Sequence, residues 1–332
     1  MRLIFETGYN SLRMKKRIRI TLISTLAVLV AVVTGGSFYM LNYSLGVDAD
    51  RVAKLKDKYH TVMNDNPELK PWMDSLQRCK ALRDTFITMP DGERQHGTFV
   101  YGWKHTGSTA ILIHGWRDCN ITMLPIAHIY EQMGYNVLLP DLHGHGRSDG
   151  DNIGMGWKDR FDVMRWMAIA DTLFRDSTGT TRQVLHGVSM GGATTMYVSG
   201  ERTPAYVKCF VEDCGYSSVW DEFHYELGEM FGLPDFPFMY TTSALCKLRY
   251  GWTFGEASAI SKVKKCHKPM LFIHGDNDDF VPSWMVNPLY AAKPQPKELF
   301  IGKGSTHAHS YRDHKAEYTK RVEKFVSKYI KN

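Results

Sequence analysis

The stretch Val184-Leu185-His186-Gly187-Val188-Ser189-Met190-Gly191-Gly192 decides the fold that we expect for the whole chain. It starts as a short apolar strand, ends in glycines and is followed by a helix-forming run at 193–199. The spacing Gly187-x-Ser189-x-Gly191 suits a sharp strand-to-helix turn, because only residues without a side chain fit two positions before and after a serine in a strained conformation. Such a turn lifts the hydroxyl above the strand ends and points the helix N-terminus at whatever the hydroxyl attacks. Because the spacing also arises by chance, the motif alone is a hypothesis for a nucleophilic serine.

Composition favours a folded domain and argues against a nucleic-acid partner. The 332 residues are 43% hydrophobic and 23% charged, which is enough apolar material for one large domain with a substantial core. Residues 1–19 carry five of the six net positive charges, so the rest of the chain is nearly neutral and offers no basic face for nucleic acid. The six cysteines form no C-x-x-C pair and no zinc-like spacing. One or two disulfides outside the cytoplasm and buried free thiols are equal alternatives.

An apolar segment near the N-terminus predicts a membrane anchor. Residues 20–41 contain no charge, and a helix of 22 residues is about 33 Å long, enough to cross the hydrocarbon core. The cluster Lys15-Lys16-Arg17-Arg19 precedes it, so we expect 1–19 to be a cytoplasmic basic N-terminus and the rest of the chain to lie across the membrane. A cleaved signal peptide is the alternative, although its apolar region is usually shorter and no A-x-A-like cleavage site is evident. Met14 is a second candidate for the true start.

The order of the remaining patterns predicts an α/β fold. Residues 42–80 are polar and helix-prone and predict a stalk with a lead-in helix to a domain at 81–332. Eight strands are expected in that domain, at 82–89, 95–103, 109–114, 135–140, 182–186, 206–212, 269–274 and 298–301. The first two form a hairpin around Pro90-Asp91-Gly92. Continuous apolar strands with helices between them indicate an eight-stranded, mostly parallel sheet with helices on both faces.

The connection between the sixth and seventh strands is unusually long. It covers about 217–268 and is rich in aromatic residues. Connections of this length are usually functional or form a small subdomain, so we expect a small helical cap over the site. Ordinary helices packed on the sheet are the alternative.

The partners of Ser189 are expected at the carboxyl ends of later strands. A serine hydroxyl is a weak nucleophile that needs a base, and the base needs an orienting group. After the seventh strand, Asp278 lies in the middle of the loop and can turn inward, whereas Asp276 is placed to bind loop N–H groups and Asp279 to face solvent. After the eighth strand, His307 is the expected base and His309 an exposed neighbour.

Two further features of this site follow from the same loops. A metal site built on His307-x-His309 is a rival interpretation, but the sequence offers no obvious further ligands, so we expect neither metal nor cofactor. The oxyanion hole needs two backbone N–H groups, and we assign them to Met190, directly after the serine, and Trp116, in the loop after the third strand. We expect a structural role for the other histidines near these loops, namely His114, His143, His145 and His186.

Taken in order, these motifs resemble the α/β-hydrolase superfamily over roughly residues 80–330. The resemblance rests on the Gly187–Gly192 turn, the His114-Gly115 loop, the turn at 141–148 and the order Ser189, Asp278, His307. Within the superfamily the chain is similar to bacterial serine aminopeptidase-like or lysophospholipase-like hydrolases, which have close counterparts of His307-Ala308-x-Ser310-Tyr311 and Asp278-x-x-Val281-Pro282. The resemblance implies Ser189 as nucleophile, His307 as base, Asp278 as orienting group and an acyl-serine intermediate. It does not fix the acyl group.

We therefore expect a serine carboxylesterase acting on small or lipid-like acyl esters. It would be held in a bacterial inner membrane by one span, with its catalytic domain on the periplasmic side. A serine aminopeptidase is the alternative, because Glu222, Glu226 and Glu229 could bind a free amine, although such residues more often form a solvated face. A non-catalytic binding module on the same fold is a third possibility. The presence of all three groups, Ser189, Asp278 and His307, argues against it.

Overall fold

The computed structural model describes residues 2–104 and 106–331, with side chains described from residue 13 onward. The chain forms two compact units. One unit combines Met1–Ser44 with Leu227–Thr253, and the other combines Leu45–Glu226 with Phe254–Asn332.

The larger unit is built on one eight-stranded sheet. Its strands are β1 (Arg83–Thr88), β2 (Arg94–Val100), β3 (Ser108–Ile113), β4 (Asn136–Pro140), β5 (Arg182–Val188), β6 (Val207–Asp213), β7 (Met270–Gly275) and β8 (Lys297–Gly302). Their order across the sheet is β1-β2-β4-β3-β5-β6-β7-β8. The pairs β1–β2 and β2–β4 are antiparallel and the other pairs are parallel. This confirms the predicted α/β fold with a mostly parallel sheet of eight strands.

The register of the central strands brings their carboxyl ends to one edge. Gly187 of β5 lies opposite Ile113 of β3 and opposite Glu212 of β6. At the other side of β6, β7 and β8 continue the parallel pairing, with Gly275 opposite Gly302. The loops that follow β3, β5, β6, β7 and β8 therefore leave the sheet along the same edge, which is where ligand sites form in open parallel sheets.

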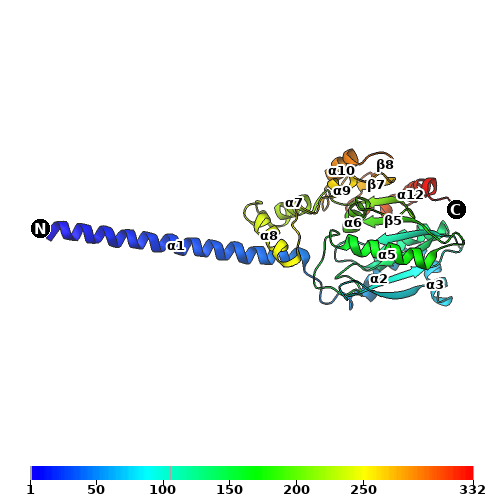
Figure 1. Ribbon diagram of the computed structural model, residues 1–332, viewed down its shortest axis with the longest axis horizontal. Coiled ribbons are helices and arrows are strands. Elements are labelled where there is room, and N and C mark those ends of the chain that lie inside the picture. Colours follow the sequence, from blue (N-terminus) through cyan, green and yellow to red (C-terminus); the bar gives the residue numbers. More distant parts are fainter. Residues whose placement is uncertain (1, 105, 332) are drawn as a thin grey trace. The chain divides into compact units, whose positions relative to one another are not determined.

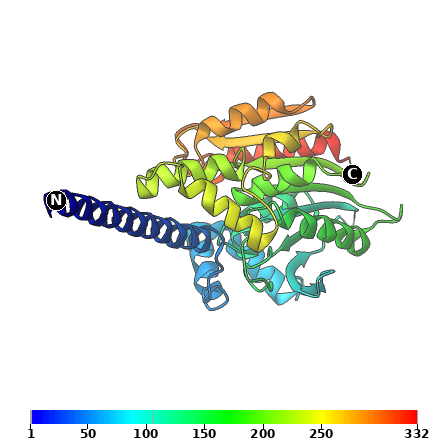
Figure 2. The ribbon, with the colours of Figure 1, turned by 60° about the vertical axis from the view of Figure 1, so that its left-hand side comes forward.

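Helices cover both faces of this sheet, as Figures 1 and 2 show. The helices that lie wholly in the larger unit are α2 (Leu55–Asp65), η1 (Pro67–Leu69), α3 (Lys70–Arg78), η2 (Asn120–Met123), α4 (Leu124–Gln132), α5 (Asp159–Phe174), α6 (Met190–Ser199), α9 (Ala259–Val263), η3 (Ser283–Met285), α10 (Val286–Ala292), α11 (Ser310–Asp313) and α12 (Lys315–Tyr329). Helix α7 (Val219–Phe231) begins in the larger unit and ends in the smaller one. Helices α5, α6, α9 and α10 pack on one face, and α4 and α12 on the other. Side chains of a strand point alternately to the two faces, and because both faces are covered, β3 is buried at every position.

Part of the segment predicted as a stalk and lead-in helix belongs to the core of the larger unit. Helix α3 has its apolar residues on one side, and Trp72, Met73 and Leu76 from that side join the hydrophobic cluster under the sheet. Leu69, in the short helix before it, is also buried there. Burial of several large side chains by this segment stabilises the larger unit by removing apolar surface from water.

The smaller unit contains one long apolar helix. Helix α1 (Arg2–Leu45) includes residues 20–41, which the sequence marks as an anchor. Among the described residues, Arg13–Leu45 is the one helix long and apolar enough to cross a membrane, with a mean hydropathy of 2.1 and its apolar window unburied. Helix α8 (Phe238–Tyr250) belongs to the same unit and ends at Gly251, whose φ of 80° is the left-handed conformation common at helix ends.

Candidate active site

The turn between β5 and α6 holds Ser189 in a conformation that few residues adopt. Ser189 has φ 58° and ψ −121°, lies between the last residue of the strand and the first of the helix, and is 8% exposed. A Cβ atom on Gly187 would collide with the backbone of Gly191, and one on Gly191 would collide with the carbonyl of Ile113. The two glycines of the motif are therefore required by close backbone approach, as its spacing predicts.

Three side chains that the sequence singled out meet above this turn. Nε2 of His307 lies 2.8 Å from Oγ of Ser189, and Nδ1 of the same ring lies 2.9 Å from Oδ2 of Asp278. The two hydrogen bonds join residues from the loops after β5, β7 and β8, each of which leaves the same sheet edge. In this arrangement Nδ1–H donates to the carboxylate, so Nε2 is free of a proton and can accept one from the hydroxyl.

The carboxylate of Asp278 is held by its own loop. Its Oδ1 accepts hydrogen bonds from the N–H groups of Phe280 and Val281, at 3.1 and 3.0 Å. Burial of the carboxyl opposes its ionisation, but hydrogen bonds from His274 and His307 outweigh burial and lower its pKa to about 2. The group is consequently an anion at any pH at which the protein would act, as an orienting group must be.

The neighbouring aspartates have other surroundings. Asp276 is exposed and accepts a hydrogen bond from the N–H of Gly304, and Asp279 is exposed. Both therefore lie where the sequence analysis placed them, one binding a loop amide and the other facing solvent.

The geometry gives little support to a metal site on His307-x-His309. Nδ1 of His309 lies 2.7 Å from the hydroxyl of Thr306, and its Nε2 lies 3.2 Å from the guanidinium of Arg312. Cys214, which follows β6, places its thiol beside Asp278 and His307, with one candidate ligand atom of each within 4.8 Å of the others. Burial, together with the charges of Asp213 and Asp278, raises the pKa of this thiol well above its usual value. The thiol therefore keeps its proton in this structure.

The loop after β3 lies against the serine. A Cβ atom on Gly115 would be 3.4 Å from Cβ of Ser189, so the chain passes the hydroxyl immediately before Trp116. Met190 is the first residue of α6, where backbone N–H groups lack partners within the helix. The assignment of the Met190 and Trp116 N–H groups to an oxyanion hole stays a prediction.

Two buried histidines hold that loop in place. Nδ1–H of His114 donates to the carbonyl of Gly115 at 2.8 Å, and its Nε2 accepts from the N–H of Leu142 at 3.0 Å. His145 similarly accepts from the N–H of Arg117 at 3.1 Å. Burial lowers the pKa of His145 well below its usual value, so the ring stays neutral and able to accept. These contacts are the structural roles that the sequence analysis expected for the histidines.

Beneath the site lies a set of buried polar groups that sequence analysis did not single out. Nε2 of His274 lies 3.4 Å from Oδ2 of Asp278 and 2.9 Å from the carbonyl of Val281. The hydroxyl of Tyr318 donates to Asp213 at 2.8 Å and also lies 3.0 Å from Nε2 of His186. The position of His274, directly before the Gly275-x-x-Asp278 loop, could have predicted its contact with Asp278. Nothing in the sequence predicts that Tyr318 of α12 contacts Asp213 at the end of β6.

Burial favours the neutral forms of the two carboxyls at the end of β6. Burial raises the pKa of Glu212 to about 8 and that of Asp213 to about 6, against opposing charges that include His274. In the folded chain Glu212 therefore keeps a proton that the unfolded chain has already lost at neutral pH. The contribution of the neutral Glu212 to the free energy of unfolding is fully present at pH values below the ordinary pKa of 4.5. This contribution is lost as pH rises through about 8.

Replacing Glu212 by Gln should remove this pH dependence. We expect the melting temperature of Glu212→Gln to exceed that of the parent by a few °C at about pH 9, with a much smaller difference near pH 5, since each kcal/mol shifts Tm by roughly 2–4 °C in a domain of this size. Thermal melts at the two pH values measure this difference, and Glu229→Gln, at an exposed glutamate, is the matched control. An equal change of Tm at both pH values would contradict the assignment.

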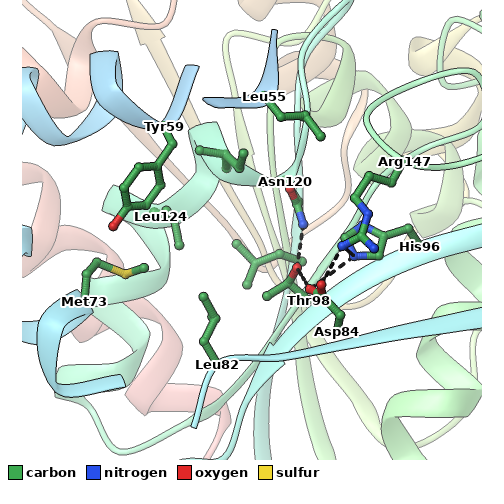
Figure 3. A pocket seen from close by; sticks show the side chains of 12 residues that line it. Leu55, Tyr59, Met73, Leu82, Asp84, His96, Thr98, Asn120, Leu124 and Arg147 are labelled. Atoms are coloured by element: carbon green, nitrogen blue, oxygen red, sulfur yellow. Dashed lines mark hydrogen bonds and ion pairs between the residues drawn. The ribbon is translucent and has the colours of Figure 1, made fainter. Parts of the chain in front are cut away.

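A cavity of about 250 Å³ lies apart from these residues, between the β1–β2 hairpin and helices α2, α3 and α4 (Figure 3). Its apolar walls include Leu55, Met73 and Leu124, and Ser189, Asp278 and His307 are not among its lining residues. The polar wall is a closed network, in which Asp84 accepts a hydrogen bond from Thr98 and pairs with Arg147 and His96. The same network reaches Asn120, whose side-chain amide donates to Thr98 and whose backbone N–H donates to Asp141, the residue directly after β4. The cavity is therefore separate from the site that contains Ser189, Asp278 and His307.

Comparison with known proteins identifies the family. The sequence model of the prolyl oligopeptidase family matches residues 121–332, a stretch that contains Ser189, Asp278 and His307. The chain belongs to the prolyl oligopeptidase family. As a member of this family with an α/β-hydrolase fold, it is a serine hydrolase of the α/β-hydrolase superfamily, which confirms the resemblance drawn from its motifs.

Proteins of similar sequence or fold to this prolyl oligopeptidase family member include an uncharacterized bacterial protein, an esterase and a peptidase. The uncharacterized protein YqkD of Bacillus subtilis is 27% identical over 258 residues, which are 76% of this chain and 82% of that protein. The Pyrococcus furiosus esterase Pf2001 superposes with a TM-score of 0.59 at 21% identity, covering 75% of this chain and 91% of the esterase. The Pyrococcus horikoshii acylaminoacyl peptidase superposes with a TM-score of 0.57 at 15% identity, covering 77% of this chain and 43% of the peptidase. At these identities the two structures show a shared fold only.

Proposed function

We propose that the protein is a carboxylesterase that cleaves acyl esters through an acyl-serine intermediate. The observation that carries this proposal is the chain of two hydrogen bonds from Ser189 through His307 to Asp278. Preference for an ester is supported by the esterase Pf2001, which has a similar fold. The match covers 91% of the length of the esterase. The ring of Phe280 also lies 4.9 Å from the imidazole of His307, so apolar surface borders the nucleophile, as an acyl chain would require.

The reaction would proceed in two halves. Nε2 of His307 takes the proton of Ser189 as Oγ attacks the ester carbonyl carbon, and the N–H groups of Met190 and Trp116 stabilise the oxyanion. The imidazolium, held by the anionic Asp278, then gives that proton to the departing alkoxide. The acyl group stays bonded to Oγ of Ser189. A water molecule, deprotonated by Nε2 of His307, then attacks the acyl carbon. The bond from that carbon to Oγ breaks, His307 returns the proton to Oγ of Ser189, and the carboxylic acid leaves.

A specific observation keeps an aminopeptidase as a second candidate. Glu222, on α7, is 3% exposed, and its Oε2 has no hydrogen-bond partner among the described residues. Burial raises its pKa well above the usual value, and the charges of Glu226 and Asp278 add to this effect. A substrate ammonium group would supply the missing positive partner for this carboxyl, since a buried carboxyl ionises when an opposite charge lies beside it.

Rates on matched esters and amides decide between the two candidates. We expect p-nitrophenyl acyl esters to be cleaved with a kcat/KM at least 100-fold above that of aminoacyl p-nitroanilides, about 3 kcal/mol of transition-state preference. In Glu222→Gln, the ester rate should stay within about twofold of the parent, because a neutral carboxyl and an amide are nearly isosteric. A higher kcat/KM for aminoacyl amides that Glu222→Gln lowers by tenfold or more would instead establish the peptidase.

We further propose that α1 anchors the protein in a bacterial inner membrane, with the hydrolase unit on the periplasmic side. The length and hydropathy of Arg13–Leu45 and the basic residues that precede the apolar run support this orientation. The full chain should therefore stay with the membrane pellet after an alkaline carbonate wash.

A further inference from the structure

Helix α1 is not a bare anchor, because the smaller unit packs two other segments against its last turns. Oγ of Ser37 lies 2.6 Å from Oγ1 of Thr241 on α8, and Ser37 is fully buried. A Cβ atom on Gly36 would lie only 2.5 Å from the ring of Phe238, so the absence of a side chain there allows α8 to approach closely. Figure 2 shows α8 beside this end of α1.

Aromatic side chains continue the contact toward the end of α1. The ring of Phe231, at the end of α7, packs edge-on against Tyr39 and Tyr43, with centroids 6.4 and 5.6 Å apart. The hydroxyl of Tyr43 also reaches the sulfur of Met230. Residues 36–43 of α1 are thus joined to 230–241, and the depth of one segment in a membrane fixes the depth of the other.

The length of the apolar run sets that depth. At 1.5 Å per residue, about 20 residues cross a hydrocarbon core of about 30 Å. Counted from Ile20, the first residue after Arg19, the far boundary of the core falls near Tyr39. Tyrosines at this boundary match the aromatic belts of membrane helices. Gly36 and Ser37, which contact α8, lie within the core on this count.

The same segment carries large apolar side chains that are exposed. Phe236 is 75% exposed and Leu248 is 84% exposed, and Tyr240 between them is more than half exposed. Positions 236, 240, 244 and 248 follow a spacing of four residues, which places those within α8 on one side of the helix. Lys247 and Arg249, in the last turn of α8, are exposed as well and could reach lipid phosphates. A soluble surface rarely exposes apolar side chains in such a cluster.

We propose that residues 227–253 form a lipid-contacting surface, which inserts Phe236, Tyr240 and Leu248 into the bilayer where α1 leaves it. The proposal rests on the proposed anchor, and it assigns to the proposed esterase a substrate class, namely acyl esters dispersed in a membrane. The bilayer is the partner because the apolar side chains continue the lipid-exposed surface of α1 at the depth that the helix length sets.

Spin labels in the full chain test the insertion. Cys79 is exposed and the other five cysteines are buried, so Cys79→Ser gives a background in which one introduced cysteine is labelled. The labelled positions are Phe236→Cys and Leu248→Cys, with Val30→Cys on α1 and Phe161→Cys on α5, both exposed, as lipid and water references. The protein is reconstituted into vesicles of phosphatidylcholine with a minor fraction of phosphatidylglycerol. Collision with oxygen, which prefers lipid, is compared with collision with a water-soluble nickel chelate.

The expected result is an oxygen-to-nickel ratio at 236 and 248 several-fold above that at 161 and close to that at 30. A ratio at 236 and 248 equal to that at 161, with a lipid-like value at 30, would refute the lipid-contacting surface and leave the anchor intact. A water-like value at 30 would refute the anchor and the surface together.

A kinetic arm separates this surface from the proposed reaction. In the double variant Phe236→Glu/Leu248→Glu, hydrolysis of a monoacyl ester carried in vesicles should fall at least fivefold, while hydrolysis of a water-soluble butyrate ester stays unchanged. Equal rates on the vesicle ester would overturn the substrate class. Failure of the unmodified protein to cleave either ester would overturn the esterase assignment, whatever the spin labels report.

Discussion

Ser189→Ala should lower kcat on acyl esters by about 10⁴- to 10⁶-fold and abolish labelling by a fluorophosphonate. The expected size follows from the loss of the attacking oxygen, which leaves only oxyanion stabilisation and substrate binding. The imidazole of His307 would keep its bond to Asp278 but would have no hydroxyl to deprotonate. Rates under saturating ester and gel-based detection of the probe measure the two effects.

Ser199→Ala is the matched control for this experiment. Ser199 is also buried and lies on α6, but its hydroxyl donates to the carbonyl of Met196 within the helix. This variant should label and turn over like the parent. If Ser189→Ala retained more than a few per cent of the activity, or if labelling persisted, Ser189 would not be the nucleophile.

Gly191→Ala should strongly destabilise the fold, because its added Cβ would overlap backbone atoms. The added Cβ would meet the carbonyl group of Ile113 and the carbonyl oxygen of His114 at distances that real Cβ atoms do not show. Backbone atoms of β3 cannot rotate away as a side chain can, so either α6 or the loop after β3 must shift. We expect a loss of about 3 kcal/mol or more in the free energy of unfolding, above the usual cost of overpacking.

Gly228→Ala supplies the contrast, because a Cβ atom on Gly228 meets nothing within 4 Å. Gly228 lies inside α7, where alanine is favoured over glycine by about 0.5–1 kcal/mol, so this variant should melt at the same temperature as the parent or slightly above it. Soluble yield and thermal melts compare the two variants. A Gly191→Ala protein with the Tm and ester turnover of the parent would show that the turn is looser than its contacts indicate.

The fold was predictable because its strands are local patterns. Apolar runs such as 109–114 and 269–274 are followed by glycine or a turn, which marks the strand ends. Helices between these runs predict a parallel sheet, because such a sheet is buried on both faces by its connecting helices. The loops that carry Ser189, Asp278 and His307 follow from the same reasoning, because every parallel strand delivers its carboxyl end to one edge.

What the sequence could not supply are contacts between segments with no shared pattern. His274 touches Asp278, and the Tyr318 hydroxyl bonds Asp213, because β6, β7 and α12 converge under the site. No periodicity in the sequence predicts either contact. The packing of α8 on α1 is of the same kind, since the sequence between them is almost two hundred residues long and Gly36, which admits Phe238, looks like any glycine of a membrane helix.

The packing of α8 on α1 has a kinetic consequence if residues 227–253 lie in the bilayer as proposed. A tethered hydrolase meets its substrate by lateral diffusion in two dimensions, so its velocity depends on the mole fraction of ester among the lipids and not on the amount per volume of buffer. Adding inert phospholipid would slow it at constant bulk ester, whereas a freely dissolved esterase acting on a soluble ester would be indifferent to such dilution.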